Sequence, residues 1–119
     1  MKADEKINYV EFPSKDIDAT KSFFTAAFGW QFIDYGDEYT AFNNEGLNGG
    51  FYKTDATATV ENGSALIVFY SRDLEQTLER IEPAGGSIKR AIFPFPGGRR
   101  FHFCDPNGNE YAVWSDKYL

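Results

Sequence analysis

The amino-acid sequence predicts an α+β fold made of two β-α-β-β-β modules whose sheets curl into a cup. Each half of the chain has one stretch of helically spaced apolar residues, with a strand-like segment before it and three after it. The two halves also align at an offset of 57 residues, which superimposes Asp16 on Asp73 and Gly29 on Gly86. We therefore expect one domain over residues 1–119, with modules at about 5–54 and 64–116.

The first module begins with a strand at residues 7–12, followed by Pro13. Asp16 is a good N-cap, because its side chain can accept a backbone N–H of the first helical turn. Apolar residues then follow a helical period up to Gly29, which suits the left-handed position after a helix. Three strands are expected after it, at residues 30–35, 38–43 and 47–53.

The second module repeats this plan after a polar linker at residues 54–64. Its first strand is predicted at 65–70, and Asp73 caps a helix that ends at Pro83 and the Gly85–Gly86 pair. A loop rich in proline and glycine is expected at 93–98. The remaining strands are expected at residues 87–92, 99–104 and 109–115.

A β-α-β-β-β unit covers one face of its sheet with the helix and leaves the other face open. Two curled sheets would enclose a concave site of the kind that small ligands use. Their edge strands need covering, so we expect a homodimer. The sequence leaves open whether the two modules pair within one chain or between two chains.

Composition excludes several classes of partner. The net charge is −6, so nucleic acid is not an expected partner. One cysteine excludes an internal disulfide. No apolar leader or membrane-length apolar run is present in the sequence, so we expect a cytoplasmic protein without a membrane partner.

Three segments resemble the vicinal oxygen chelate superfamily, which includes glyoxalase I, bleomycin-resistance proteins and extradiol dioxygenases. They are residues 10–30, which end in Phe-Gly-Trp, residues 71–88, which contain Ala-Gly-Gly, and residues 97–115, which contain Asp-Pro-Asn-Gly-Asn. The chain is most similar to the small, single-domain glyoxalase-like members. The resemblance implies the glyoxalase/bleomycin-resistance fold.

The resemblance also implies where a metal would bind in metal-dependent members. Their histidine ligands lie seven residues before each helix-capping Asp, and those positions hold Tyr9 and Leu66 here. Their final carboxylate lies seven residues after the Asp of the Asp-Pro turn, which reaches Ala112, and the fourth position falls near Gly50 or Phe51. These residues offer at most one phenolic oxygen, so we expect no metal and no cofactor.

Strand alternation predicts which side chains face the cup. For the strand at residues 99–104, either alternate set of side chains could face the cup. Phe101 and Phe103 suit the helix-covered side. We therefore favour the orientation that places Arg100, His102 and Cys104 on the cup side. The candidate ligand-binding residues are Tyr9, Glu11, Phe51, Leu66, Tyr70, Arg100, His102, Ala112 and Trp114.

Three functions are compatible with these residues. The first is binding of a small amphipathic or aromatic molecule, in which Arg99 and Arg100 could hold a ligand carboxylate. The second is a metal-free lyase or isomerase with Glu11, His102 and Glu110 as acid and base, so catalysis stays an open question. The third is a non-catalytic interaction module with a filled cup. Both residues also have a purely structural interpretation, in which His102 only hydrogen-bonds a neighbour and Cys104 is a small buried hydrophobic residue.

Overall fold

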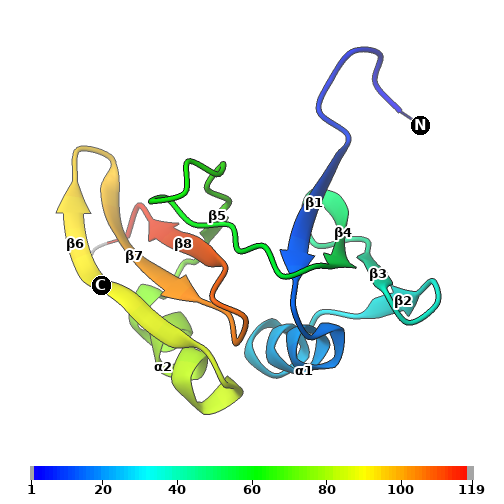
Figure 1. Cartoon of the computed structure of the whole chain (residues 1–119). Coiled ribbons are helices and arrows are strands. Elements are labelled where there is room, and N and C mark those ends of the chain that lie inside the picture. Colours follow the sequence, from blue (N-terminus) through cyan, green and yellow to red (C-terminus); the bar gives the residue numbers. More distant parts are fainter. Residues whose placement is uncertain (1, 118–119) are drawn as a thin grey trace.

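The computed structural model describes residues 2–117 and contains two four-stranded sheets and two helices (Figure 1). The α+β class and the order of elements in both modules are confirmed. No helix among the described residues is long and apolar enough to cross a membrane. The elements are β1 (Tyr9–Ser14), α1 (Ile17–Phe28), β2 (Phe32–Asp34), β3 (Tyr39–Phe42), β4 (Asn48–Lys53), β5 (Val68–Tyr70), α2 (Leu74–Ala84), β6 (Ser87–Phe95), β7 (Gly98–Cys104) and β8 (Glu110–Ser115).

Both sheets have the same topology. The strand orders are β1-β4-β3-β2 and β5-β8-β7-β6, so the first strand of each module pairs with the last. That pairing is parallel in both sheets, and the other pairings are antiparallel. The structural repeat therefore matches the repeat inferred from the sequence.

The helix ends follow the predicted caps. The carboxylates of Asp16 and Asp73 each accept a first-turn backbone N–H at 3.1 Å. Helix α1 ends at Gly29, and α2 ends at Gly85, the first residue of the predicted glycine pair. Gly86 is needed for close packing instead, because a Cβ there would lie 2.6 Å from the ring of Phe23 and 2.7 Å from the carbonyl oxygen of Cys104.

Two strands end later in the chain than the sequence predicted, and both C-terminal extensions contain a proline. Strand β1 continues through Pro13, and β6 continues through Pro94 into the segment expected to be a loop. Both strands lie at the edge of their sheet. A proline is tolerated on an edge strand because the missing N–H need not remove a ladder hydrogen bond.

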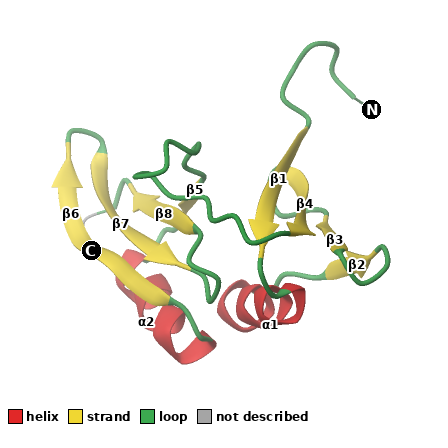
Figure 2. Ribbon diagram, viewed as in Figure 1, coloured by secondary structure: helices red, strands yellow, loops and turns green. Residues whose placement is uncertain are grey.

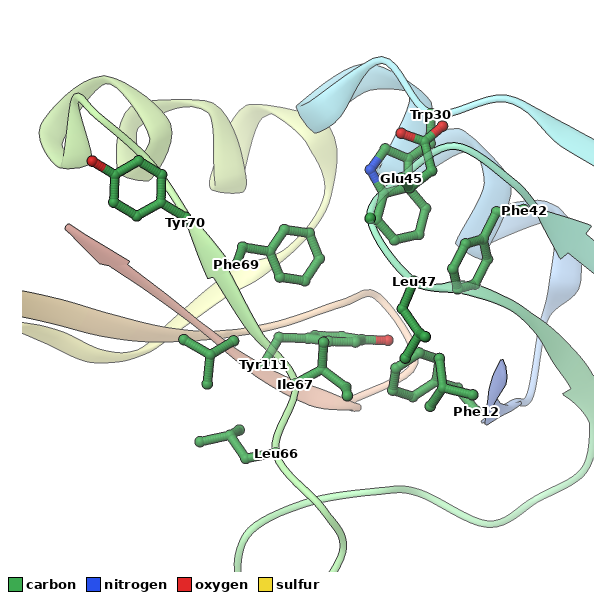
Figure 3. A pocket seen from close by; sticks show the side chains of 13 residues that line it. Phe12, Trp30, Phe42, Glu45, Leu47, Leu66, Ile67, Phe69, Tyr70 and Tyr111 are labelled. Carbon is green, nitrogen blue, oxygen red and sulfur yellow. The ribbon is translucent and has the colours of Figure 1, made fainter. Parts of the chain in front are cut away.

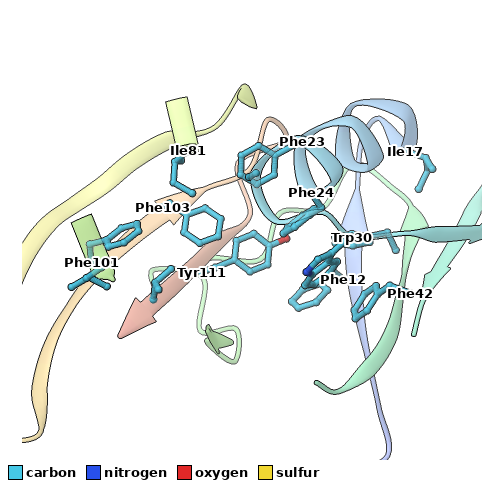
Figure 4. Packing of buried hydrophobic residues seen from close by; sticks show 14 residues of the cluster. Phe12, Ile17, Phe23, Phe24, Trp30, Phe42, Ile81, Phe101, Phe103 and Tyr111 are labelled. Carbon is cyan, nitrogen blue, oxygen red and sulfur yellow. The ribbon is translucent and has the colours of Figure 1, made fainter. Parts of the chain in front are cut away.

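One aromatic core joins the two modules (Figure 4). Phe24 of α1 is fully buried, and its ring centroid lies 5.5 Å from that of Phe51 in the first sheet and 5.4 Å from that of Tyr111 in the second. Phe12 of β1 also contacts Tyr111 directly. Figure 2 shows α1 between the two sheets. The helix-covered faces of both sheets therefore converge on the same core.

The Asp-Pro-Asn-Gly-Asn turn fastens the second module to the first. Asp105 organises it by accepting hydrogen bonds from the backbone N–H groups of Asn107 and Asn109 and from the hydroxyl of Tyr111. The amide nitrogen of Asn109 then donates to the carbonyl of Pro13 at 2.6 Å, and that of Asn107 donates to the hydroxyl of Thr20 at 2.7 Å. This turn is therefore a joint between the modules.

Replacing Asn109 with alanine is expected to lower the free energy of unfolding by about 1–3 kcal/mol. Asn109 is 1 % exposed, and its side chain also accepts the N–H of Ala58. The change therefore leaves the N–H of Ala58 and the carbonyl of Pro13 without their hydrogen-bond partner. Urea denaturation would measure the effect. A loss below about 0.5 kcal/mol, the range of a neutral surface change, would show that the turn does not hold the modules together.

Candidate binding site on the open sheet faces

The open face of the first sheet carries Tyr9 and Glu11 of β1. Glu11 lies opposite Gly50 of β4, which lies opposite Ala41 of β3. Phe51 points to the other face and is fully buried in the core, so its assignment as a cup residue is wrong. A shift of one residue moves a side chain to the opposite face of a strand, and Gly50 takes the open-face position.

Tyr39 covers Gly50 on this face and was not among the predicted site residues. A Cβ at Gly50 would collide with the Tyr39 hydroxyl. That hydroxyl donates to a carboxylate oxygen of Glu11 at 2.9 Å and lies 2.7 Å from the hydroxyl of Tyr9. Burial, followed by the hydrogen bonds to Tyr9 and Glu11, raises the pKa of Tyr39, so its hydroxyl keeps its proton and stays a donor.

The open face of the second sheet carries most of the predicted residues. Strand pairing sets Arg100 opposite Trp114, His102 opposite Ala112, and Cys104 opposite Glu110. The favoured orientation of residues 99–104 is therefore the observed one. Burial raises the pKa of the Cys104 thiol, so this cysteine is not poised as a thiolate.

His102 lies between two charged side chains. Its Nδ1 is 2.8 Å from Oε2 of Glu110, and its Nε2 is 2.9 Å from Nη2 of Arg100. A guanidinium can only donate, so Nε2 carries the lone pair and Nδ1 carries the proton. The other carboxylate oxygen of Glu110 accepts the N–H of Val60 at 3.1 Å.

These contacts fix the ionisation of Glu110. Burial opposes the charge, but the hydrogen bonds from His102 and from Val60 outweigh it and hold the pKa of Glu110 below its ordinary value. Both nitrogens of His102 and both oxygens of Glu110 are occupied by protein groups. His102 and Glu110 therefore belong to one hydrogen-bond network. Glu11, the third predicted acid–base residue, lies on the other sheet.

The donor set does not fit the metal that the family resemblance implies. The four corresponding positions hold Tyr9, Gly50, Leu66 and Ala112, and the Tyr9 hydroxyl is already hydrogen-bonded to Tyr39. Within residues 2–117, no three or more His, Cys, Asp or Glu side chains are grouped so that they could hold a metal ion. A divalent cation needs three or four such donors.

The predicted Arg99–Arg100 pair is divided between the two faces of β7. Arg99 forms an ion pair with Glu75 of α2, with Nη1 2.5 Å from Oε2, on the helix-covered side. Arg100 stays on the open face, where its register partner on β6 is Phe93. Another arginine, Arg90 of β6, lies opposite His102 and was missed because the β6 pairing contains irregularities that a sequence does not reveal.

Aromatic side chains surround this polar group. The ring of Trp114 lies 5.2 Å from that of Tyr70 and 6.2 Å from that of Phe95. Tyr70 is 52 % exposed, and its hydroxyl donates to Asp116 at 2.6 Å. The open face of the second sheet therefore combines exposed aromatic area with a fixed polar network.

A cavity of about 590 Å³ lies elsewhere, between the helix-covered sides of the two sheets (Figure 3). It is lined by core side chains such as Phe12, Phe69 and Tyr111. Of the predicted site residues, only Leu66 and Tyr70 reach it. This cavity is therefore not the predicted cup, because Tyr9, Glu11, Arg100, His102 and Trp114 do not line it, although Val68 and Tyr70 of the edge strand β5 do.

Comparisons with solved structures show the same fold. A glyoxalase-related enzyme from Fulvimarina pelagi superimposes with a TM-score of 0.78 at 17% identity, covering 93% of this chain and 88% of that one. The fosfomycin resistance protein FosX from Listeria monocytogenes superimposes with a TM-score of 0.77 at 20% identity, covering 96% of this chain and 95% of that one.

Sequence comparison gives a relative and a family. The anthracycline biosynthesis protein DauV from Streptomyces sp. (strain C5) is 26% identical over 124 residues, covering 89% of this chain. The chain spans only 45% of the length of DauV. The profile of the Glyoxalase/Bleomycin resistance protein/Dioxygenase superfamily matches residues 6–113. The chain therefore belongs to this superfamily, as the resemblance in its sequence predicted.

Proposed function

We propose that this protein binds a small molecule with an aromatic or amphipathic body, without a metal, between the open sheet faces of two copies. The main observation behind this proposal is that large apolar side chains are exposed on both open faces. Tyr9 is 43% exposed on the first sheet. Val68, 42% exposed on the edge strand of the second sheet, lies opposite Ala112 and also lines the inter-sheet cavity. Exposed apolar area of this kind marks a ligand or partner surface.

Two copies are needed because the modules of one chain meet through their helix-covered faces. Strands β1 and β5 are edge strands of separate sheets, so both leave a row of backbone groups without a strand partner. A two-fold-related copy could set the first module of one chain against the second module of the other. Tyr9 and Glu11 would then form one wall of a cup, and Arg100 and Trp114 the other.

Binding is favoured over catalysis by the hydrogen bonds around His102. Proton transfer by His102 would have to break its hydrogen bond to Arg100 or to Glu110, and breaking a hydrogen bond of a buried side chain costs free energy. The names of the relatives support a small organic ligand, because DauV is named for anthracycline biosynthesis and FosX for fosfomycin resistance.

Mixing two binding-defective variants tests both the site and the assembly. Tyr9→Ala removes an aromatic side chain from the first module, and Trp114→Ala removes one from the second. Each change is expected to weaken binding about tenfold, the value of a lost aromatic contact plus its buried area. If modules pair between chains, about half of the dimers in a refolded equimolar mixture contain one chain of each variant. Each mixed dimer has one intact cup and one doubly altered cup, so roughly a quarter of all sites become intact.

The probes are 2-naphthalenemethanol, 4-biphenylmethanol and 9-anthracenemethanol, with affinity measured by calorimetry and mass by analytical ultracentrifugation. Leu47→Ser is the matched control, because Leu47 lines the inter-sheet cavity and not an open face. Its probe affinity should equal that of the wild type. Loss of binding in this control alone would show that the probes bind in the inter-sheet cavity. A wild-type protein that binds none of the three probes would favour the non-catalytic interaction module.

A further inference from the structure

We propose that the ligand carries an anionic group, a carboxylate or a phosphate, and that Arg90 and Arg100 hold it at the β6–β7 side of the open face. This inference rests on the proposed function and specifies the chemistry of the ligand. The two arginines come from neighbouring strands of the second sheet.

The two guanidinium groups converge on one aromatic ring. The strand register places Arg90 opposite His102 and Phe93 opposite Arg100, so all four side chains are on the same face. The guanidinium carbon of Arg90 lies 3.6 Å from the centroid of the Phe93 ring, and that of Arg100 lies 5.7 Å from it. Both positive charges therefore lie beside the same apolar ring on this face of the sheet.

No carboxylate of the described chain neutralises these two arginines. Three other basic residues do form ion pairs, since Arg99 pairs with Glu75, Lys21 with Asp34 and Lys89 with Glu61. The chain has 18 acidic residues and only 12 basic ones, yet none of the ion pairs formed by the described residues involves Arg90 or Arg100. An anion that reaches both guanidinium groups would accept charge-assisted hydrogen bonds from each of them.

Arg100 is held in position before any ligand arrives. Its Nε and Nη2 both donate to Nε2 of His102, at 3.3 Å and 2.9 Å, and His102 is fixed in turn by Glu110. Among the described residues, Nη1 of Arg100 has no hydrogen-bond partner in the structure. A donor that is already ordered binds an anion without the entropy cost of ordering a long side chain.

The neighbouring side chains define the rest of the ligand. Trp114 lies directly opposite Arg100 on the next strand, and Tyr70 packs against Trp114. An aromatic body resting on these rings would extend its acidic group toward the arginines. The ligand class is therefore an aromatic or amphipathic acid rather than a neutral or cationic compound.

Matched pairs of probes test this inference. The three alcohols used above are compared with 2-naphthoate, 4-biphenylcarboxylate and 9-anthracenecarboxylate, and 2-naphthyl phosphate distinguishes a phosphate preference from a carboxylate preference. At low salt the anion should bind at least about tenfold more tightly than its alcohol, and the difference should shrink as salt is added, because exposed charges are screened.

Arg90→Gln isolates the anion contact, because Arg90 lies outside the His102 hydrogen-bond network. It is expected to reduce carboxylate affinity about tenfold and to leave alcohol affinity unchanged. Lys15→Gln removes one positive charge at an exposed position before α1, in the other module, and is the control that should change neither affinity. Equal binding of acid and alcohol by the wild type would overturn the anion site but not the proposed function, whereas binding of neither would overturn the proposed function itself.

Discussion

Replacing Phe24 with alanine is expected to destabilise the protein by about 3–5 kcal/mol, the usual cost of removing a buried phenyl ring. Phe24 is fully buried. Its ring lies 4.7 Å from that of Trp30 and within 5.5 Å of the rings of Phe51 and Tyr111, which come from different sheets. The cavity left by the ring would open at the place where the two modules join, so both modules lose packing contacts.

The free energy of unfolding would be measured by urea denaturation, followed by tryptophan fluorescence and by far-ultraviolet circular dichroism. Ser22→Ala, an exposed change on the same helix, should stay within about 0.5 kcal/mol of the wild type. The two signals should still change together in the Phe24 variant, because a shared core unfolds as one unit. A loss below about 1 kcal/mol, or two separate transitions, would show that the modules have independent cores.

Local features of the fold were predictable because local chemistry determines them. Asp16 and Asp73 cap their helices because their carboxylates accept first-turn N–H groups. An Asp directly before helically spaced apolar residues predicts a helix start in any sequence. Strand alternation likewise placed His102 and Trp114 on the correct face. These inferences need only neighbours within a few positions along the chain.

Features that depend on contacts between distant segments could not be predicted. Phe51 was placed on the wrong face because the sequence does not fix the register of β4, and one residue decides between core and surface. The angle between the two sheets depends on how Phe24 packs against both of them, so the sequence could not tell whether one chain closes the cup.

In the candidate site, too, local features were predictable and contacts between distant segments were not. His102 was recognisable as a polar residue on the cup side, but its two hydrogen bonds involve Arg100, two positions earlier, and Glu110, on the next strand. Val60 reaches Glu110 from the linker, 50 positions away in sequence. A residue type that suggests acid–base chemistry therefore became part of a fixed network once the strands were paired.

Removing the carboxylate of Glu110 is expected to lower stability by about 2–4 kcal/mol in the Glu110→Ala variant, because it leaves buried donors without partners. The Nδ1–H of His102 and the N–H of Val60 both lose their acceptor, and Glu110 is only 7% exposed. Glu110→Gln keeps one carbonyl oxygen and should lose less, since it can still accept one of the two hydrogen bonds. Urea denaturation at pH 7 would measure both losses.

The pH dependence of stability separates this effect from a simple loss of packing. The pKa of Glu110 is lowered on folding, so its ionised form stabilises the folded protein above the unfolded value, near 4.5, and this contribution is lost as the pH falls through the lower folded value. The wild type should therefore lose stability over this range more steeply than Glu110→Gln, which has no proton to bind at this position. Parallel pH profiles for the two proteins would contradict a charged Glu110 in the network. A profile that is less steep in the variant would show that the ionised carboxylate of Glu110 stabilises the folded protein through its hydrogen bonds from His102 and Val60.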